Sequence, residues 1–231
     1  MRALIITPAC IALGACNTIV HATLPSSEII KLANRPFSTT KTIQARVMIQ
    51  VETSCEEYKE AIMPVLERYG HNVRYRGCAD WDRFWEDQVQ ISSPHSFIHV
   101  DMWVEMTQFS DISDADPKGL FGIGFTPMEN GRTDLFFITT ERLALAENEI
   151  RENMGAIVKT LRKISIVFEN DTDDEIGLEF GPAHVDGAEI SRGDRITVPA
   201  NASITVVPFD DHVEELVGDI PEKFASIIVS R

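Results

Sequence analysis

One strand-like segment carries the residue types best suited to acid–base chemistry. Residues 97–106 alternate in polarity with a period of two, which predicts a β-strand with one apolar face. The other face carries His99, Asp101 and Glu105. A histidine titrates near neutral pH, so His99 and Asp101 could form a proton-transfer pair or hold a metal ion. The solvent face of an ordinary antiparallel strand has the same pattern, and both interpretations stay open.

Two acidic turns contain the oxygen ligands that calcium prefers outside the cytosol. They comprise Asp111, Asp114 and Asp116 in the first turn, and Asp171, Asp173 and Asp174 in the second. The first turn lacks the glycine and the terminal glutamate of the calcium-binding helix-loop-helix pattern, so a solvated turn is the simpler interpretation. Both turns stay candidates for calcium. The simpler expectation, which we adopt, is that the protein holds no metal and no cofactor.

Motifs for nucleophilic catalysis are missing from the sequence. It contains no Gly-x-Ser-x-Gly elbow, no His-Glu-x-x-His, and no Ser-x-x-Lys accompanied by the other penicillin-binding motifs. The remaining histidines are scattered along the chain, and sequence cannot show whether they meet. They include His71, His95, His184 and His212.

The chain is strongly acidic, with a formal net charge of -15 at pH 7. Nucleic acid is therefore a poor partner, because its phosphates would be repelled. The same repulsion argues against a protein that lies flat on anionic lipid. The charge most simply serves solubility.

The first residues have the pattern of an export signal. Arg2 precedes an apolar run, residues 3–13, that is too short to span a bilayer. The following Leu13-Gly14-Ala15-Cys16 resembles the lipobox of bacterial lipoproteins. The resemblance implies cleavage before Cys16 and an acyl chain, such as palmitate, on its thiol. The alternative is an ordinary signal cut after Ala22, which would release a soluble periplasmic protein.

Cysteine usage agrees with an exported protein. Cys10 would leave with the signal and Cys16 would carry lipid, so Cys55 and Cys78 remain in the folded part. In an oxidising compartment these two are expected to form one disulfide, worth about 3 kcal/mol for a loop of this length. The alternative is a pair of buried free thiols.

The hydrophobic pattern predicts an α+β protein in four parts. Residues 1–15 form the signal peptide, and residues 16–41 form a tether with one short helix near 26–33. Residues 42–162 form a mostly antiparallel sheet with two main helices, and residues 163–231 form a small immunoglobulin-like β-sandwich. The strands are expected at 43–51, 73–78, 97–106, 120–125, 134–139, 164–168, 176–180, 196–198, 204–206 and 225–229. The helices are expected to start near Ser54, Thr140 and Asp210, with Pro64 kinking or dividing the first.

Three aromatic residues follow the second predicted strand within a short charged segment. They are Trp81, Phe84 and Trp85. A lid packed over one end of the sheet explains them. They are also candidate partner contacts, because tryptophan is enriched at the energetic centres of interfaces.

The layout resembles small envelope lipoproteins encoded by bacteriophages and prophages. The resemblance rests on the lipobox, the tether, the strand-to-helix junction at 51–55, the second cysteine Cys78 and the β-rich last part. It implies an accessory protein with an envelope protein as partner, which obstructs a receptor or excludes other phages. Asn17 after the lipidated cysteine implies sorting to the outer membrane.

Two hypotheses from different classes follow. The favoured one is a lipid-anchored, non-catalytic envelope protein that acts through protein–protein binding. The alternative is a periplasmic hydrolase or metal-dependent enzyme that uses His99 and Asp101. It requires a third polar group beside them in a concave site.

Overall fold

The structure is a computed structural model of the chain. It describes residues 18–35, 40–51, 55–80, 96–109, 116–128, 131–154, 163–216 and 223–229. Several residues singled out in the sequence lie outside these ranges, namely Cys10, Cys16, Trp81, Phe84, Trp85, His95, Asp111 and Asp114.

A strand at the start of the described chain lies in the interior of the sheet. β1 (Thr18–Pro25) pairs antiparallel with β2 (Thr40–Val51) and parallel with β7 (Lys163–Glu169). The side chains of Val20, Ala22 and Leu24 are buried in the core. This corrects the predicted tether, although the short helix within it is present as α1 (Ser26–Ala33). The tether prediction failed because half of the pairing of β1 is with a strand about 140 residues later.

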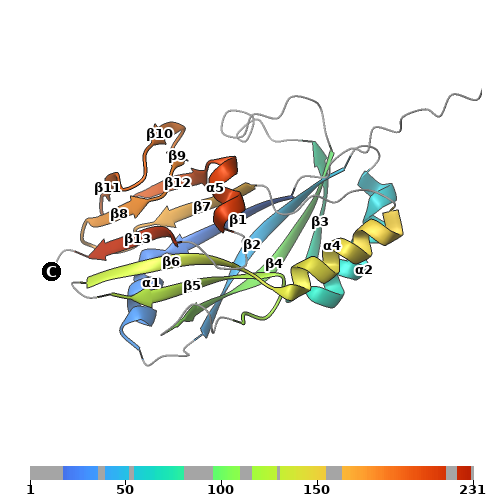
Figure 1. The fold of residues 1–231 in the computed structure, drawn as a ribbon, viewed down its shortest axis with the longest axis horizontal. Helices are drawn as coiled ribbons and strands as arrows, with labels where there is room; N and C mark the ends of the chain where they lie inside the picture. Colours follow the sequence, from blue (N-terminus) through green and yellow to red (C-terminus); the bar gives the residue numbers. More distant parts are fainter. Residues whose placement is uncertain are drawn as a thin grey trace, which may run out of the picture.

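The strands form one mixed sheet (Figure 1) in the order β10-β9-β12-β7-β1-β2-β4-β5-β6-β13-β8-β11, and β3 pairs with β4 beside this path. The remaining bounds are β3 (Arg74–Asp80), β4 (Ser96–Gln108), β5 (Phe121–Pro127), β6 (Arg132–Thr139), β8 (Ile176–Phe180), β9 (Ala183–Val185), β10 (Ala188–Ile190), β11 (Arg195–Val198), β12 (Ser203–Pro208) and β13 (Lys223–Val229). Except for the short strands β9 and β10, these strands lie where the alternation of polar and apolar residues predicts them.

The strands β2, β4 and β3 are the part of the sheet that carries the candidate site. β4 pairs antiparallel with β2 along its length and with β3 along its first half. β2 and β3 are therefore parallel to each other on opposite sides of β4. α2 (Cys55–Tyr69) connects them and runs unbroken through the exposed Pro64. Of the two predicted effects of this residue, a kink or a division, the division is wrong.

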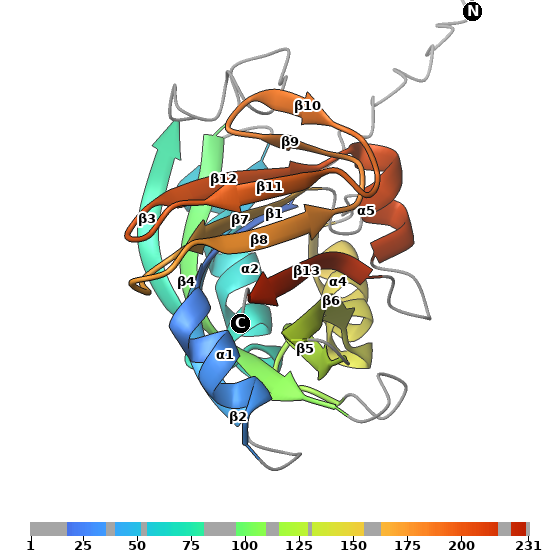
Figure 2. The same cartoon turned by 90° about the vertical axis from the view of Figure 1, so that its left-hand side faces the viewer.

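The two predicted domains share this one sheet. β13, from the last part of the chain, pairs with both β6 and β8, and β1 pairs with both β2 and β7. Figure 2 shows the sheet curled so that β7 and β12 lie near β8 and β11. Inside the curl, the ring of Phe168 lies 5.6 Å from that of Phe180 and 6.2 Å from that of Phe224. The structure is thus α+β with a curled mixed sheet, and a separate immunoglobulin-like sandwich is not confirmed.

The longer helices cover one side of the β3–β4 region. α4 (Glu141–Met154) lies against α2 (Figure 1), and an ion pair of 2.5 Å joins Arg68 of α2 to Glu149 of α4. α5 (Asp210–Leu216) is the short helix predicted near Asp210. Among the described helices, none is long and apolar enough to cross a membrane.

The cysteine pair joins the start of α2 to β3. Cys55 and Cys78 are bonded through their sulfur atoms, and their Cα atoms lie 5.8 Å apart, a usual separation for a disulfide. The fold therefore places the two cysteines as the sequence prediction requires. Whether the mature protein is oxidised at this pair stays a prediction.

We predict that β1 is required for stability. Leu24→Ala should lower the free energy of unfolding by about 2–5 kcal/mol, because this fully buried side chain would leave a cavity. Thr23→Ala, at the exposed neighbouring position, should change it by less than about 0.5 kcal/mol. Urea denaturation measures both, and equal effects at the two positions would contradict the interior placement of β1.

We also predict that reduction destabilises the protein. Cys78→Ser, or treatment with a reductant, should lower the free energy of unfolding by about 3 kcal/mol, since a cross-link over this loop constrains the unfolded chain. Thermal unfolding with and without reductant measures the effect. The thermal unfolding midpoint of the Cys78→Ser variant should not change when reductant is added. If the midpoint of the wild type did not change either, the two thiols would be free.

Candidate functional site

A row of polar side chains crosses five strands on the side of the sheet away from α2. Strand register pairs His21 of β1 with Ser165 of β7 and with Arg46 of β2. The same register pairs Arg46 with Asp101 of β4, and Asp101 with Arg74 of β3. Side chains at directly paired positions share a sheet face. Residues from distant parts of the chain thus lie side by side in one line.

Asp101 is the centre of this row. Its side chain is almost fully buried, with 3% of the residue exposed. Arg46 donates a hydrogen bond from Nε to Oδ1 at 3.2 Å, and Gln44 donates from Nε2 to Oδ2 at 2.6 Å. Arg76 also donates from Nε to Oδ2. Both carboxylate oxygens are therefore occupied by donors from the two neighbouring strands.

A β-bulge in β3 presents Arg76 to the site. The register of β3 shifts between Tyr75 and Gly77, so both Arg76 and Gly77 lie opposite His99 of β4. Gly77 has a φ of 135°, a conformation that side-chain-bearing residues rarely adopt. A Cβ built at this position would meet no atom within 4 Å. The glycine therefore leaves the space beside Arg76 open.

The arginines determine the ionisation of Asp101. Burial opposes the charged form, but the hydrogen bonds from Arg76 and Arg46 outweigh it and hold the pKa of the Asp101 carboxyl below its ordinary value. A carboxylate with a lowered pKa and occupied oxygens is a poor proton acceptor. The predicted His99–Asp101 pair does share one face, but the groups that converge on Asp101 are arginines and a glutamine.

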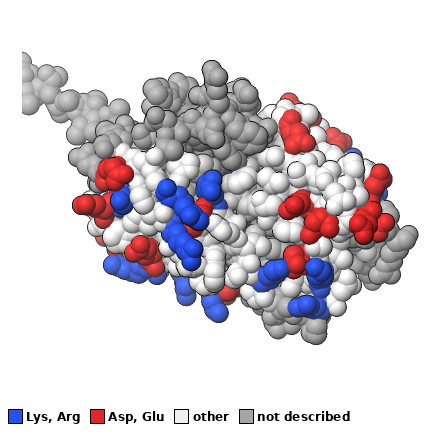
Figure 3. All heavy atoms as spheres, turned by 180° about the vertical axis from the view of Figure 1, so that it is seen from behind, with Lys and Arg blue, Asp and Glu red and all other residues white. Residues whose placement is uncertain are grey.

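The described residues line two hollows on this face. The larger, of about 460 Å³, is lined by Arg46, Arg76, Gly77, Cys78 and His99. The smaller, of about 250 Å³, is lined by Gln44, Asn72, Arg74, Asp101, Met102 and Trp103. The view from behind shows Lys and Arg side chains gathered on the face opposite α2 and α4 (Figure 3). An acidic protein thus presents a local basic surface, which we call the arginine face and define by Arg46, Arg74 and Arg76.

An aromatic residue lies beside the arginine face. Trp103 is 42% exposed, and its ring contacts that of His71 edge-on at 5.4 Å between centroids. The backbone N–H of Trp103 donates to the carbonyl oxygen of His71 at 2.8 Å. Trp103 is therefore a large apolar group held in place next to exposed cations.

His21 lies at the other end of the row. Burial lowers the pKa of its imidazole, and the positive charge of Arg46 lowers it further. Its Nδ1 lies 3.3 Å from the Ser165 hydroxyl. His21 is therefore harder to protonate than an ordinary histidine.

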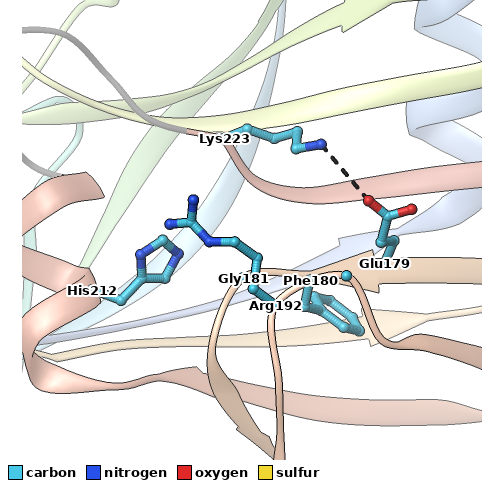
Figure 4. A pocket seen from close by; sticks show the side chains of 7 residues that line it. Glu179, Phe180, Gly181, Arg192, His212 and Lys223 are labelled. Atoms are coloured by element: carbon cyan, nitrogen blue, oxygen red, sulfur yellow. Dashed lines mark ion pairs between the residues drawn. The ribbon is translucent and has the colours of Figure 1, made fainter.

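A third hollow lies on a different part of the sheet. Its volume is about 340 Å³, and its lining includes Glu179, Arg192, His212 and Lys223. Figure 4 shows the Arg192 guanidinium pointing toward the His212 ring, while Lys223 turns to Glu179 at 3.9 Å. The His212 ring packs so closely on Gly181 that a Cβ there would lie 2.1 Å from Nε2. Glu179 is also bound by two Nη atoms of Arg132, which makes this region a network of paired charges.

The calcium candidates do not assemble into a site within the described residues. Asp171 accepts hydrogen bonds from the backbone N–H and the hydroxyl of Ser27, at 2.8 and 2.5 Å, and so caps the start of α1. Asp116, Asp173 and Asp174 are exposed. In the described part of the chain, no group of three or more His, Cys, Asp or Glu side chains is placed to hold a metal ion.

The sequence pattern did not reveal the arginines. It placed His99 and Asp101 on the polar face of the strand at 97–106 and predicted strands at 43–51 and 73–78, but it did not show which strands pair. The glycine at position 77, inside a predicted strand, was a signal for a bulge. The pairing of β4 with both β2 and β3, which brings the three strands together, is tertiary information.

Comparison with known proteins gives this chain no relative. No protein-family model matches it, no curated protein sequence matches it, and no solved structure matches its fold.

We predict that ionised Asp101 stabilises the fold. Asp101→Asn should lower the free energy of unfolding at pH 7 by roughly 2 kcal/mol, because charge-assisted hydrogen bonds from Arg46 and Arg76 are lost. Since folding lowers the pKa of this carboxyl, its contribution is complete above the pKa of an unfolded aspartate, about 4. The contribution is lost as the pH falls through the lower folded-state value.

Chemical denaturation between pH 7 and pH 3 measures this effect. The difference between wild type and Asp101→Asn should shrink as the pH falls below about 4. Asp173→Asn, a matched change at an exposed position, should have little effect at any pH. A difference that stays constant across the range would show that the ionisation of Asp101 is not coupled to folding.

Proposed function

We propose that the protein is a lipid-anchored envelope protein that acts by binding and not by catalysis. The observation that carries the proposal is the position of β1. This strand begins at Thr18, two residues after the lipobox cysteine, and lies between β2 and β7 inside the sheet. A signal that is cut before Cys16 leaves the strand whole.

The alternative cleavage fits the fold poorly. A cut after Ala22 would remove the five residues of β1 that pair with β2, and three of these, Ile19, Val20 and Ala22, are buried. The gap would expose the facing edges of β2 and β7. The position of β1 therefore favours processing at Cys16 over release of a soluble protein that starts at Thr23.

The anchor would then be short. Only Asn17 lies between Cys16 and Thr18, so the acyl chain would attach almost directly to one end of an interior strand. The sheet would be held close to the bilayer and not on a long tether. Asn17 at this position favours the outer membrane under the sorting rule implied by the resemblance to bacterial lipoproteins.

Binding is favoured over catalysis by the state of Asp101. The hydrolase alternative needs a proton acceptor beside His99, whereas both oxygens of Asp101 already accept hydrogen bonds from Arg46, Arg76 and Gln44 and its pKa is lowered. What the site offers is exposed cations next to an exposed tryptophan, Trp103. Tryptophan and arginine are the residues most enriched at the centres of interfaces. We therefore propose that the partner is an acidic component of the bacterial envelope. The protein would then act as a phage-encoded accessory or exclusion factor.

Lipidation is tested by comparing two cysteine variants in the bacterial host. Wild type and Cys10→Ser should incorporate radioactive palmitate and sediment with the outer membrane, because the lipidated thiol is at position 16. Cys16→Ser should incorporate no label and leave the membrane fraction. Mass spectrometry of the mature N-terminus provides a second readout.

Other outcomes would contradict the anchor. A mature protein that begins at Thr23, or an uncut chain in the cytosol, would exclude it. Challenge of the same strains with related phages tests the exclusion role. Resistance that is lost with Cys16→Ser would connect the role to anchoring, and equal sensitivity of all strains would argue against it.

A further inference from the structure

The two arginines around Asp101 have unused donors. Each contributes only its Nε to the carboxylate, and no Nη atom of Arg46 or Arg76 hydrogen-bonds to another described residue. A guanidinium has five N–H donors, so each arginine keeps four N–H groups for a ligand. About half of each side chain is exposed, 52% for Arg46 and 49% for Arg76.

Asp101 restricts the orientation of both side chains. It is nearly buried and belongs to the strand between β2 and β3, so each guanidinium is attached to a fixed point of the sheet. A donor that is already oriented loses less conformational entropy when it binds. The carboxylate of Asp101 offsets one of the two positive charges, so Arg46, Arg76 and Asp101 together carry a net charge of about +1.

The space in front of the arginines suits a small ligand. Arg46 and Arg76 line the same hollow of about 460 Å³, within the usual range for small-molecule sites. Gly77 keeps the hollow open, and His99 lines it as well. Two guanidinium groups and an imidazole are side chains that commonly surround a tetrahedral oxyanion, and the fork of arginine matches phosphate oxygens in pairs.

We propose that the hollow between Arg46 and Arg76 binds a phosphate group. The group belongs either to a soluble phosphorylated compound or to a phospholipid headgroup. The N–H groups of Arg46 and Arg76 that do not bind Asp101 need acceptor oxygens. A carboxylate supplies only two, whereas a phosphate group supplies at least three and carries a negative charge of up to two. The assignment rests on the proposed binding function and specifies its ligand, but it does not require the lipid anchor.

The test uses the full chain with Cys16→Ser, so that an attached lipid contributes nothing. Inorganic phosphate is titrated by calorimetry, and vesicles of phosphatidylglycerol are compared with vesicles of phosphatidylcholine by cosedimentation. Arg46→Gln and Arg76→Gln should each weaken phosphate binding at least tenfold. Arg142→Gln removes the same charge from the exposed side of α4 and should leave binding unchanged.

A conservative variant separates geometry from charge. Arg76→Lys keeps the positive charge but loses the planar fork, so it should bind several-fold more weakly than wild type. In the wild-type protein, phosphate should shift the side-chain N–H resonances of Arg46 and Arg76 and not those of Arg142. This readout stays decisive if the glutamine variants fail to fold.

The two arms identify the source of the phosphate. Binding of inorganic phosphate without preference for phosphatidylglycerol indicates a soluble phosphorylated ligand. An arginine-dependent preference for phosphatidylglycerol vesicles indicates a lipid headgroup. No binding in either arm, or binding of an acidic peptide alone, overturns the assignment. Failure of palmitate labelling would remove the anchor and leave this result intact, so the two proposals fail separately.

Discussion

The insertion of β1 between β2 and β7 is the constraint on which the rest of the structure depends. This strand connects β7, β12, β9 and β10 to the remainder of the hydrogen-bonded path. Without it, the facing edges of β2 and β7 would have unpaired backbone N–H and C=O groups. Such groups cost free energy if they stay buried, and they form an open sheet edge if they do not. Any processing of the N-terminus must therefore stop before Thr18 if the sheet is to remain whole. The proposed anchor at Cys16 would thus lie directly before the strand that holds the sheet together.

A buried charge organises the candidate site in a similar way. An isolated carboxylate at the position of Asp101 would be expensive to bury, and it is stabilised only because β2 and β3 each bring an arginine to it. Those arginines are then held at a fixed place on an acidic protein. The local field on this face is consequently opposite in sign to the net charge. A negatively charged ligand can meet a favourable surface here although the molecule as a whole would repel it.

The spacing of apolar residues was enough to predict most strands and helices. Apolar residues recur every two residues on the buried face of a strand and about every 3.6 residues on the buried face of a helix. This pattern failed at β1, which was placed in a polar tether that contains Pro25 and Pro36, and it did not predict the short strands β9 and β10. One of the two interpretations of the strand at 97–106 placed Asp101 and Glu105 on a solvent-exposed face, whereas both are largely buried. These errors share one cause: burial at these positions is decided by strands and loops from elsewhere in the chain.

The sequence by itself determined the α+β fold class, the position of most helices and strands and the acidic charge, since these follow from composition and short-range periodicity. It also identified the cysteine pair and the polar face of β4. Only the tertiary structure decided that the two predicted domains share one curled sheet and that Asp101 is surrounded by Arg46 and Arg76. The reason is that strand order and register depend on backbone pairing between distant segments, and no short stretch of residues encodes which strand will lie beside it.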